Sequence, residues 1–360
     1  MPIYSKRGHL VGGGCRNGRQ ISHRNSIELL VGMNSQNASH EVIKSRLRYV
    51  DRYLKAIEAK LAETNALLEA SRPGGPIVLR WPRAEGVRDN WGDKLNPVLV
   101  EALSGRQALH ASDIRPNSAN KTYLVIGSGL RNMKAGDVVW GMGFISIEDR
   151  PSARPFRVCA VRGPHTKKKL LSQGIACPEV FGDPALLFPL FYNKPVELEY
   201  DLGIIQHFRE VGFEPLPFES KTLKVRVILI TGSIEDTIDA IRSCKQIVSS
   251  SLHGLIAAHA YGICATWIKF SNRPLGDDFK FKDYFASIGL DDVQPYEINA
   301  DTSYDHLVGD ELYLTPKVDL VQLILACPFI QLERQKELIS LMSWAYPNGF
   351  KPRYTKLLNF

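Results

Sequence analysis

Short apolar runs and amphipathic segments alternate from residue 76 onward, and this alternation restricts the fold more than any other feature of the sequence. Short apolar runs are typical of strands buried on both faces, and single helices between them make such strands parallel. After a loop-like stretch at 188–200 the alternation starts again. The pattern predicts an α/β fold with two open parallel sheets. The expected strands are 77–81, 122–126, 138–143, 156–161, 202–207, 225–230, 246–248 and 264–268, and the expected helices are 96–103, 164–173, 234–244, 252–261, 317–326 and 330–344.

The restart near residue 195 divides the chain into domains. We predict a basic, flexible leader with an amphipathic helix over 1–75, α/β domains over 76–195 and 196–328, and a C-terminal helix and tail over 329–360. Open parallel sheets bind ligands at the carboxyl ends of their strands, so we expect a cleft there.

The N-terminal 75 residues carry most of the excess positive charge. They hold 12 of the 45 Lys and Arg residues but only 6 of the 38 Asp and Glu residues. The rest of the chain is nearly neutral, which argues against nucleic acid as a partner. The basic leader either lies near an anionic membrane surface or forms a solvated tail.

Apolar residues between 43 and 68 recur with a period of 3.5, which is typical of a helix with one apolar seam. Such a helix either pairs with its copy in a homo-oligomer or lies along its own chain. The sequence leaves both alternatives open.

The sequence also indicates a compartment. No apolar run follows the first basic residues, and no apolar stretch reaches the ~20 residues of a membrane span. The six cysteines form no CxxC pair and no metal-like spacing. We therefore expect a cytoplasmic, thiol-reduced protein without a metal, at most peripheral at the inner face of the plasma membrane.

Two turns of the N-terminal half are candidate site segments. Asn90-Trp91-Gly92-Asp93 precedes the helix predicted over 96–103, with Pro97 in its first turn. Asp93 is either a general base or the cap of that helix. Gly127-Ser128-Gly129 ends a strand, where glycines let backbone N–H groups approach a bound anion.

Arg162 and His207 each end a predicted strand. The guanidinium of Arg162 lies next to a helix start and suits a carboxylate or phosphate, or it ties its loop to a neighbouring acid. His207 faces the cleft if its strand is correctly assigned, and is otherwise a surface histidine.

The segment Ser249-Ser250-Ser251-Leu252-His253-Gly254 is the strongest local signal. Its hydroxyls and the free N–H groups of the following helix form a candidate phosphate cradle, to which Ser250 and Ser251 contribute. His253 titrates near neutrality, so it can transfer a proton or stabilise an anion.

Taken in order, the motifs resemble the polysaccharide pyruvyl transferase family, and most of all its bacterial exopolysaccharide ketal-forming branch. The resemblance covers roughly 76–325 and lies outside the first 75 residues. It rests on NWGD at 90–93, GSG at 127–129, VWGMGF at 139–144, VRGPHT at 161–166, GDPALLFP at 182–189 and SSSLHGLIAAHAYGI at 249–263.

The resemblance implies a glycosyltransferase-B-like pair of Rossmann-like domains. It also implies transfer of the pyruvyl group of phosphoenolpyruvate onto two hydroxyls of a hexose as a cyclic ketal, with release of phosphate. The acceptor would be an exopolysaccharide repeat unit on a lipid carrier, and phosphoenolpyruvate would be a co-substrate, with no cofactor or metal. Some members carry Arg immediately before the Leu-His pair, where this chain has Ser251.

The resemblance places Arg162 and His253 in the donor site. We assign donor binding to Arg162, phosphate stabilisation or acid catalysis to His253, and hydroxyl activation to Asp93. Two other functions compete: a nucleotide-sugar glycosyltransferase of the same architecture, and a non-catalytic carbohydrate-binding scaffold.

Overall fold

The computed structural model describes residues 74–83, 90–114, 121–210, 220, 222–299, 302–304, 307–308 and 318–346. The basic leader and the helix predicted over 43–68 lie outside the described residues, as does the end of the predicted tail. The N-terminal helical extension therefore stays a prediction.

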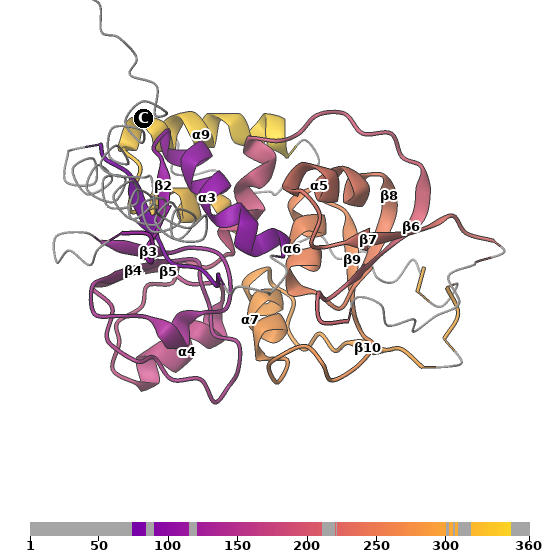
Figure 1. Ribbon diagram of the computed structural model, residues 1–360, viewed down its shortest axis with the longest axis horizontal. Helices are drawn as coiled ribbons and strands as arrows, with labels where there is room; N and C mark the ends of the chain where they lie inside the picture. Colours follow the sequence, from indigo (N-terminus) through magenta and orange to yellow (C-terminus); the bar gives the residue numbers. More distant parts are fainter. Residues whose placement is uncertain are drawn as a thin grey trace, which may run out of the picture. The chain divides into compact units, whose positions relative to one another are not determined.

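Within the described residues, each of two sheets contains five strands, and every pair of neighbouring strands is parallel (Figure 1). The first sheet has the order β2-β1-β3-β4-β5 and the second β10-β9-β8-β6-β7. The predicted α/β class with two parallel sheets is confirmed, whereas glycosyltransferase-B-like packing stays a prediction. The strands are β1 (Ile77–Leu79), β2 (Ala108–His110), β3 (Thr122–Leu124), β4 (Asp137–Trp140), β5 (Arg157–Ala160), β6 (Tyr200–Gln206), β7 (Val225–Leu229), β8 (Cys244–Ser249), β9 (Cys264–Lys269) and β10 (Tyr296–Glu297).

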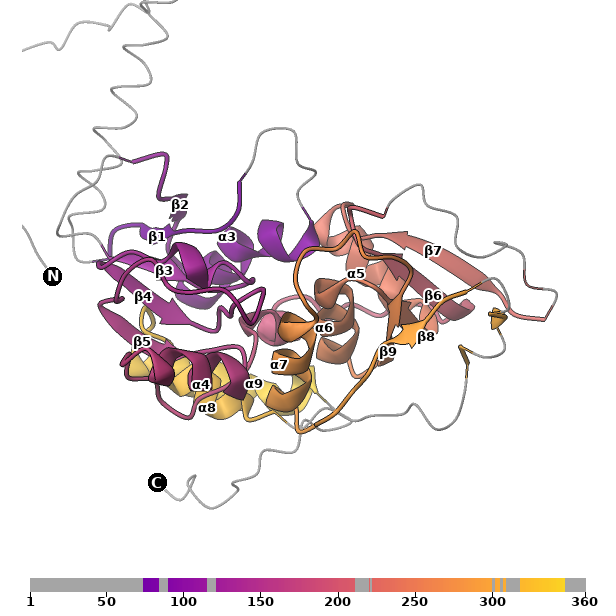
Figure 2. The same cartoon turned by 90° about the horizontal axis from the view of Figure 1, so that it is seen from below.

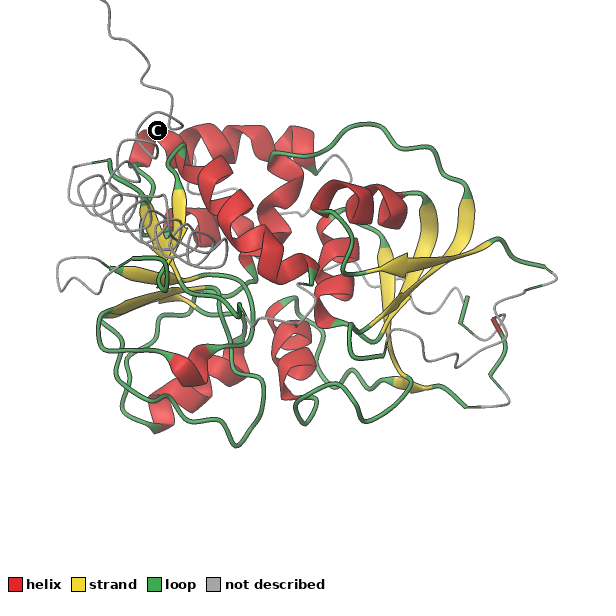
Figure 3. Cartoon of the chain, viewed as in Figure 1, coloured by secondary structure: helices red, strands yellow, loops and turns green. Residues whose placement is uncertain are grey.

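Helices lie around both sheets (Figure 3). All four residues of β4 are buried, as expected for a parallel strand covered on both faces. The edge strands β2 and β10 and the helix α7 had no counterpart among the predicted elements. The helices are α3 (Trp91–Ser104), α4 (Pro164–Ser172), α5 (Ile234–Arg242), α6 (Leu252–Ala260), α7 (Phe279–Ser287), α8 (Leu320–Leu325) and α9 (Leu332–Ala345), and the 3₁₀ turns are η1 (Leu130–Asn132) and η2 (Pro184–Leu190).

Helix α3 begins five residues before the predicted start, so the prediction that Pro97 lies in its first turn is wrong. Asn90 caps the helix: its Oδ1 accepts the N–H groups of Gly92 and Asp93 at 3.1 and 3.3 Å. Pro97 has no N–H for the carbonyl of Asp93. The side-chain amide of Asn96 donates to that carbonyl at 3.4 Å instead, so the helix continues through the proline.

The last two helices return to the first half of the chain. The indole Nε1 of Trp140 donates to the carbonyl of Leu323 in α8 at 2.9 Å. Arg334 in α9 donates to the carbonyls of Ala102 and Leu103 at the end of α3, and α9 runs beside α3 in Figure 1. Helix α8, predicted to end the second domain, and α9, predicted to follow it, thus both contact the first half. The predicted domain limits stay predictions.

Helices α6 and α7 lie between the two sheets (Figure 2). Helix α6 directly follows the carboxyl end of β8, and α7 packs against α4 of the first half. Among the described residues, no helix is long and apolar enough to cross a bilayer.

Candidate active site

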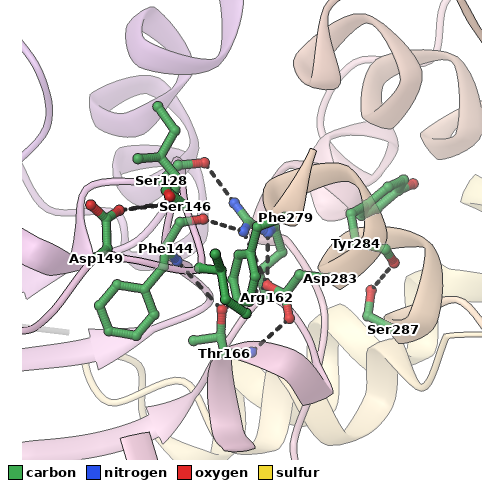
Figure 4. Close-up of polar contacts among 12 residues, drawn as sticks. Ser128, Phe144, Ser146, Asp149, Arg162, Thr166, Phe279, Asp283, Tyr284 and Ser287 are labelled. Carbon is green, nitrogen blue, oxygen red and sulfur yellow. Dashed lines mark hydrogen bonds and ion pairs between the residues drawn. The ribbon is translucent and has the colours of Figure 1, made fainter. Parts of the chain in front are cut away.

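Arg162 follows β5 and is fully buried. Its Nε donates to Oδ2 of Asp283 in α7 at 3.0 Å, its Nη1 to Oγ of Ser128 at 2.6 Å, and its Nη2 to the carbonyl of Phe144 at 2.6 Å (Figure 4). Asp283 also accepts from the N–H and the hydroxyl of Thr166 at 2.8 and 2.7 Å. Arg162 thus ties three loops to a neighbouring acid, one of the two alternatives left open by the sequence.

Gly143, after β4, makes room for this arginine. A Cβ at position 143 would lie 2.6 Å from Cζ of Arg162, so no other residue fits without moving the guanidinium. The N–H of Gly143 donates to the carbonyl of Gly127 at 3.0 Å. The predicted turn Gly127-Ser128-Gly129 is therefore held by Gly143 through the carbonyl of Gly127 and by Arg162 through the hydroxyl of Ser128. Ser128, half-buried, is the residue of this turn that has a side chain.

His253 is the second residue of α6, and its imidazole meets the other half of the chain. Its Nδ1 lies 2.7 Å from Oδ1 of Asn90. A Cβ on Gly92 would lie 2.4 Å from the imidazole ring. The NWGD segment thus supplies a polar partner for His253 and, at its glycine, the space for the ring.

His253 is neutral at physiological pH. Burial, with the positive charges of Lys280 and Arg162, lowers its pKa to about 3. Oδ1 of Asn90 already accepts two backbone N–H groups, which identifies it as the acceptor, so we assign the proton of the neutral imidazole to Nδ1. Nε2 then presents a lone pair and has no hydrogen-bond partner in the described part of the chain.

Asp93 occupies the first turn of α3 and is half-buried. The cap of this helix is Asn90, so the reading of Asp93 as the cap is wrong. Its carboxylate accepts a hydrogen bond from the side-chain amide of Asn90. Asp93 and His253 therefore share Asn90 as a partner.

The three serines differ in their partners. The hydroxyl of Ser249 donates to the carbonyl of Ile205 at 3.1 Å, and that of Ser250 donates to Oε2 of Glu210 at 2.5 Å. Ser251 precedes α6, and its side chain caps no N–H group of the helix. Of the predicted cradle, Ser251 alone keeps a hydroxyl without a protein partner among the described residues.

His207 directly follows β6 and is only 8% exposed, so it is not a surface histidine. Its N–H donates to Oγ of Ser250 at 3.0 Å, and its Nδ1 accepts the N–H of Arg209 at 3.2 Å. Burial first, and then the charges of Lys280, His253 and Arg209, lower its pKa to about 3. His207 therefore lies in the electrostatic neighbourhood of His253.

Sequence reasoning missed two residues of this region, Asp283 and Lys280, which both lie in α7. The run Phe-Lys-Phe-Lys-Asp-Tyr-Phe carries no motif that separates them from an ordinary amphipathic helix. Lys280 is 7% exposed, and burial lowers its pKa to about 8. The described residues contain no group of His, Cys, Asp and Glu that could hold a metal ion.

Fold and site together define an α/β protein whose polar centre lies where two parallel sheets meet, with a neutral histidine beside buried cations. A sequence model described as polysaccharide pyruvyl transferase matches residues 109–272. The chain belongs to the polysaccharide pyruvyl transferase family, which makes it a transferase and implies a polysaccharide acceptor.

Two relatives are similar over more than half of the chain. Uncharacterized protein L143 of Acanthamoeba polyphaga mimivirus is 30% identical over 212 residues, which cover 56% of this chain and 72% of that protein. Succinoglycan biosynthesis protein ExoV of Rhizobium meliloti (strain 1021) is 24% identical over 222 residues, covering 57% of this chain and 64% of that protein. One relative is viral, so a bacterial source stays a prediction.

Proposed function

We propose that the protein transfers the pyruvyl group of phosphoenolpyruvate onto a hexose of an exopolysaccharide repeat unit, as a cyclic ketal. The observation that carries this proposal is His253, whose Nε2 has no hydrogen-bond partner among the described residues. Burial and the positive charges of Lys280 and Arg162 lower its pKa. Phosphoenolpyruvate brings a phosphate and a carboxylate, and cationic side chains bind both groups.

The reaction forms two bonds from C2 to hydroxyl oxygens, first by an addition and then by a substitution. A hydroxyl oxygen of the hexose bonds to C2 of phosphoenolpyruvate while the methylene carbon gains a proton, which gives a tetrahedral phosphate ester. The second hydroxyl oxygen then bonds to C2 as the bond from C2 to the phosphate oxygen breaks. The two hydroxyls lose one proton each. In the overall balance, one proton is gained by the methylene carbon, which becomes a methyl group, and the other leaves with inorganic phosphate.

His253 acts on the donor through Nε2. Its neutral state leaves Nε2 ready to accept a proton, and a bound anion favours the protonated ring. The resulting imidazolium holds the phosphate or delivers the proton, while its Nδ1–H stays on Asn90. Asp93, on the same amide, accepts the proton of the attacking hydroxyl.

Arg162 contributes to donor binding on its Nη1 side, where Ser128 is half-buried. The other guanidinium nitrogens are held by Asp283 and Phe144 in the interior. In this proposal Ser128 and the glycines on either side of it contact the donor, and Arg162 keeps them in place.

The similarity to a succinoglycan biosynthesis protein supports a polysaccharide repeat unit as acceptor. A lipid-linked unit would bring the enzyme to the inner face of the plasma membrane, in agreement with the basic leader. A chain without residues 1–75 should then partition less onto anionic vesicles than the full chain.

The test is acceptor-dependent phosphate release from phosphoenolpyruvate, measured with and without a lipid-linked oligosaccharide fraction. His253→Ala should abolish the release. His165→Ala, which removes an exposed histidine of α4, is the matched control and should retain it. If the wild type neither releases phosphate nor binds phosphoenolpyruvate in a titration, the proposed donor is wrong, and saturation by a nucleotide sugar would identify a glycosyltransferase.

A further inference from the structure

A cavity of about 350 Å³ opens where β8 and β9 end and α7 begins. Ser250 lines it, which connects the cavity to the serine segment before α6. The charged and hydroxyl side chains of its wall are those of Glu210, Ser250, Lys269, Ser271, Asp277, Asp278 and Lys280.

The charged groups of this wall other than Lys280 already have partners. Asp277 accepts hydrogen bonds from the hydroxyl of Ser146 and the N–H of Ile147. Glu210 is fully buried and accepts hydrogen bonds from the hydroxyls of Ser250 and Ser271, at 2.5 and 2.6 Å. Lys269 pairs with Asp278, another residue of the wall, at 3.6 Å. Lys280 is therefore the charged side chain of this wall whose burial these contacts do not explain.

Lys280 forms no ion pair with any residue that the structure describes. Its Nζ donates one hydrogen bond, to the carbonyl of Leu275 at 3.1 Å. Nζ also lies 5.2 Å from the centroid of the Phe281 ring. An ammonium group has three hydrogens to donate, so one carbonyl and one aromatic ring leave this buried lysine able to bind a further acceptor.

The charge of Lys280 also acts on the proposed donor site. Its positive charge contributes, after burial, to the low pKa of both His253 and His207. The guanidinium of Arg162 donates hydrogen bonds to Asp283, Phe144 and Ser128. The ammonium of Lys280 donates one hydrogen bond, to Leu275, and can donate more. A compact ammonium suits a phosphate group, which accepts hydrogen bonds from many directions.

We propose that Lys280 binds the phosphate group of the anionic donor in this cavity, next to Ser250 and the start of α6. The assignment rests on the proposed function, because the donor is taken to be phosphoenolpyruvate. It makes Lys280, and not Arg162, the residue that directly neutralises the phosphate. Lys280 is then a binding residue, and its loss should raise KM for the donor more than it lowers kcat.

The test compares Lys280→Met with Lys282→Met. Both substitutions remove one positive charge from α7, but the side chain of Lys282 is exposed. We expect Lys280→Met to weaken phosphoenolpyruvate binding by about 10- to 100-fold in a calorimetric titration, as for loss of a charge-assisted contact. Lys282→Met should bind as the wild type does.

Thermal unfolding separates binding from a structural role. Methionine fills a similar volume and needs no solvation, so Lys280→Met should unfold at the wild-type temperature or above it. Unchanged donor affinity in this variant, or lost affinity together with a lowered unfolding temperature, would overturn the assignment.

The proposed function and the assignment of Lys280 can fail separately. If the wild type binds no phosphoenolpyruvate, the same variants are titrated with inorganic phosphate. Phosphate binding that is lost in Lys280→Met and kept in Lys282→Met supports a phosphate site with another donor. Phosphate binding that is equal in all three proteins, or absent from the wild type, refutes the site.

Discussion

Nδ1 of His253 lies 2.7 Å from Oδ1 of Asn90, a residue 163 positions earlier in the chain. The same oxygen caps α3 through the N–H groups of Gly92 and Asp93. One amide therefore ends a helix of the first half and orients the imidazole of the second. A change at Asn90 acts on stability and on the state of His253 together.

Asn90→Asp should raise the pKa of His253 from about 3. Aspartate is as good a helix cap as asparagine, so α3 keeps its start. The new carboxylate beside Nδ1 favours the imidazolium, and we expect an increase of one unit or more, with the acid limb of the activity profile moving to higher pH. NMR titration of the imidazole measures it, with the exposed Asn132→Asp as control. A His253 pKa that stays at its wild-type value contradicts the contact.

Gly92→Ala should lower activity at least about tenfold without unfolding the protein. Alanine is favoured over glycine inside a helix by roughly 0.5–1 kcal/mol. Its Cβ, however, would lie 2.4 Å from the ring of His253, so the imidazole must move off Asn90. Gly136→Ala adds the same methyl group in open space and serves as the control for the phosphate-release assay. Equal activity in both variants would show that the position of the ring is not required.

Arg162→Ala should destabilise the fold by about 3–5 kcal/mol, because it leaves the carboxylate of Asp283 buried without its cation. Urea unfolding at neutral pH measures this loss. Glu179→Gln removes the 81%-exposed partner of an ion pair with Lys167 and should cost less than about 1 kcal/mol. If Arg162→Ala is no more destabilising than this control, the guanidinium is not paired as described.

The free energy of unfolding should fall as the pH drops from 7 toward 4. His207, His253 and His259 have folded pKa values of about 3, 3 and 4, below the ordinary value of 6.5. Below about pH 6 the unfolded chain therefore binds protons that the folded chain does not, and each histidine removes up to about 1.4 kcal/mol per pH unit.

Urea midpoints at several pH values test this slope. His259→Gln should reduce the slope by the share of one histidine, whatever it does to the stability at pH 7. His259 is 1% exposed, and its Nδ1 lies 2.9 Å from the hydroxyl of Tyr284, whereas Nδ1 of His253 contacts Asn90. A slope equal to that of the wild type would mean that the pKa of His259 is the same in the folded and the unfolded chain.

Much of the fold could be read from local patterns. Eight of the ten described strands coincide with predicted apolar runs, because a strand covered on both faces must be apolar wherever the chain places it. The edge strands β2 and β10 were not predicted, because strands this short and partly exposed show little periodicity in the sequence. The start of α3 was predicted too late in the sequence. The side chain of Asn96 donates to the carbonyl that Pro97 leaves without an N–H donor, so the helix extends further toward the N-terminus than Pro97 suggests.

The sequence by itself determined two parallel α/β halves and a histidine behind serines at the start of a helix, because strand burial and the strand-to-helix junction are local properties. Only the tertiary structure decided that Asp283 neutralises Arg162 from 121 residues away, and that Lys280 is buried without an ion pair among the described residues. The physical reason is that the sequence of α7, Lys and Asp among aromatic residues, is that of an ordinary amphipathic helix. Which of those charges is buried, and against what, depends on the packing of α7 against α4 of the other half.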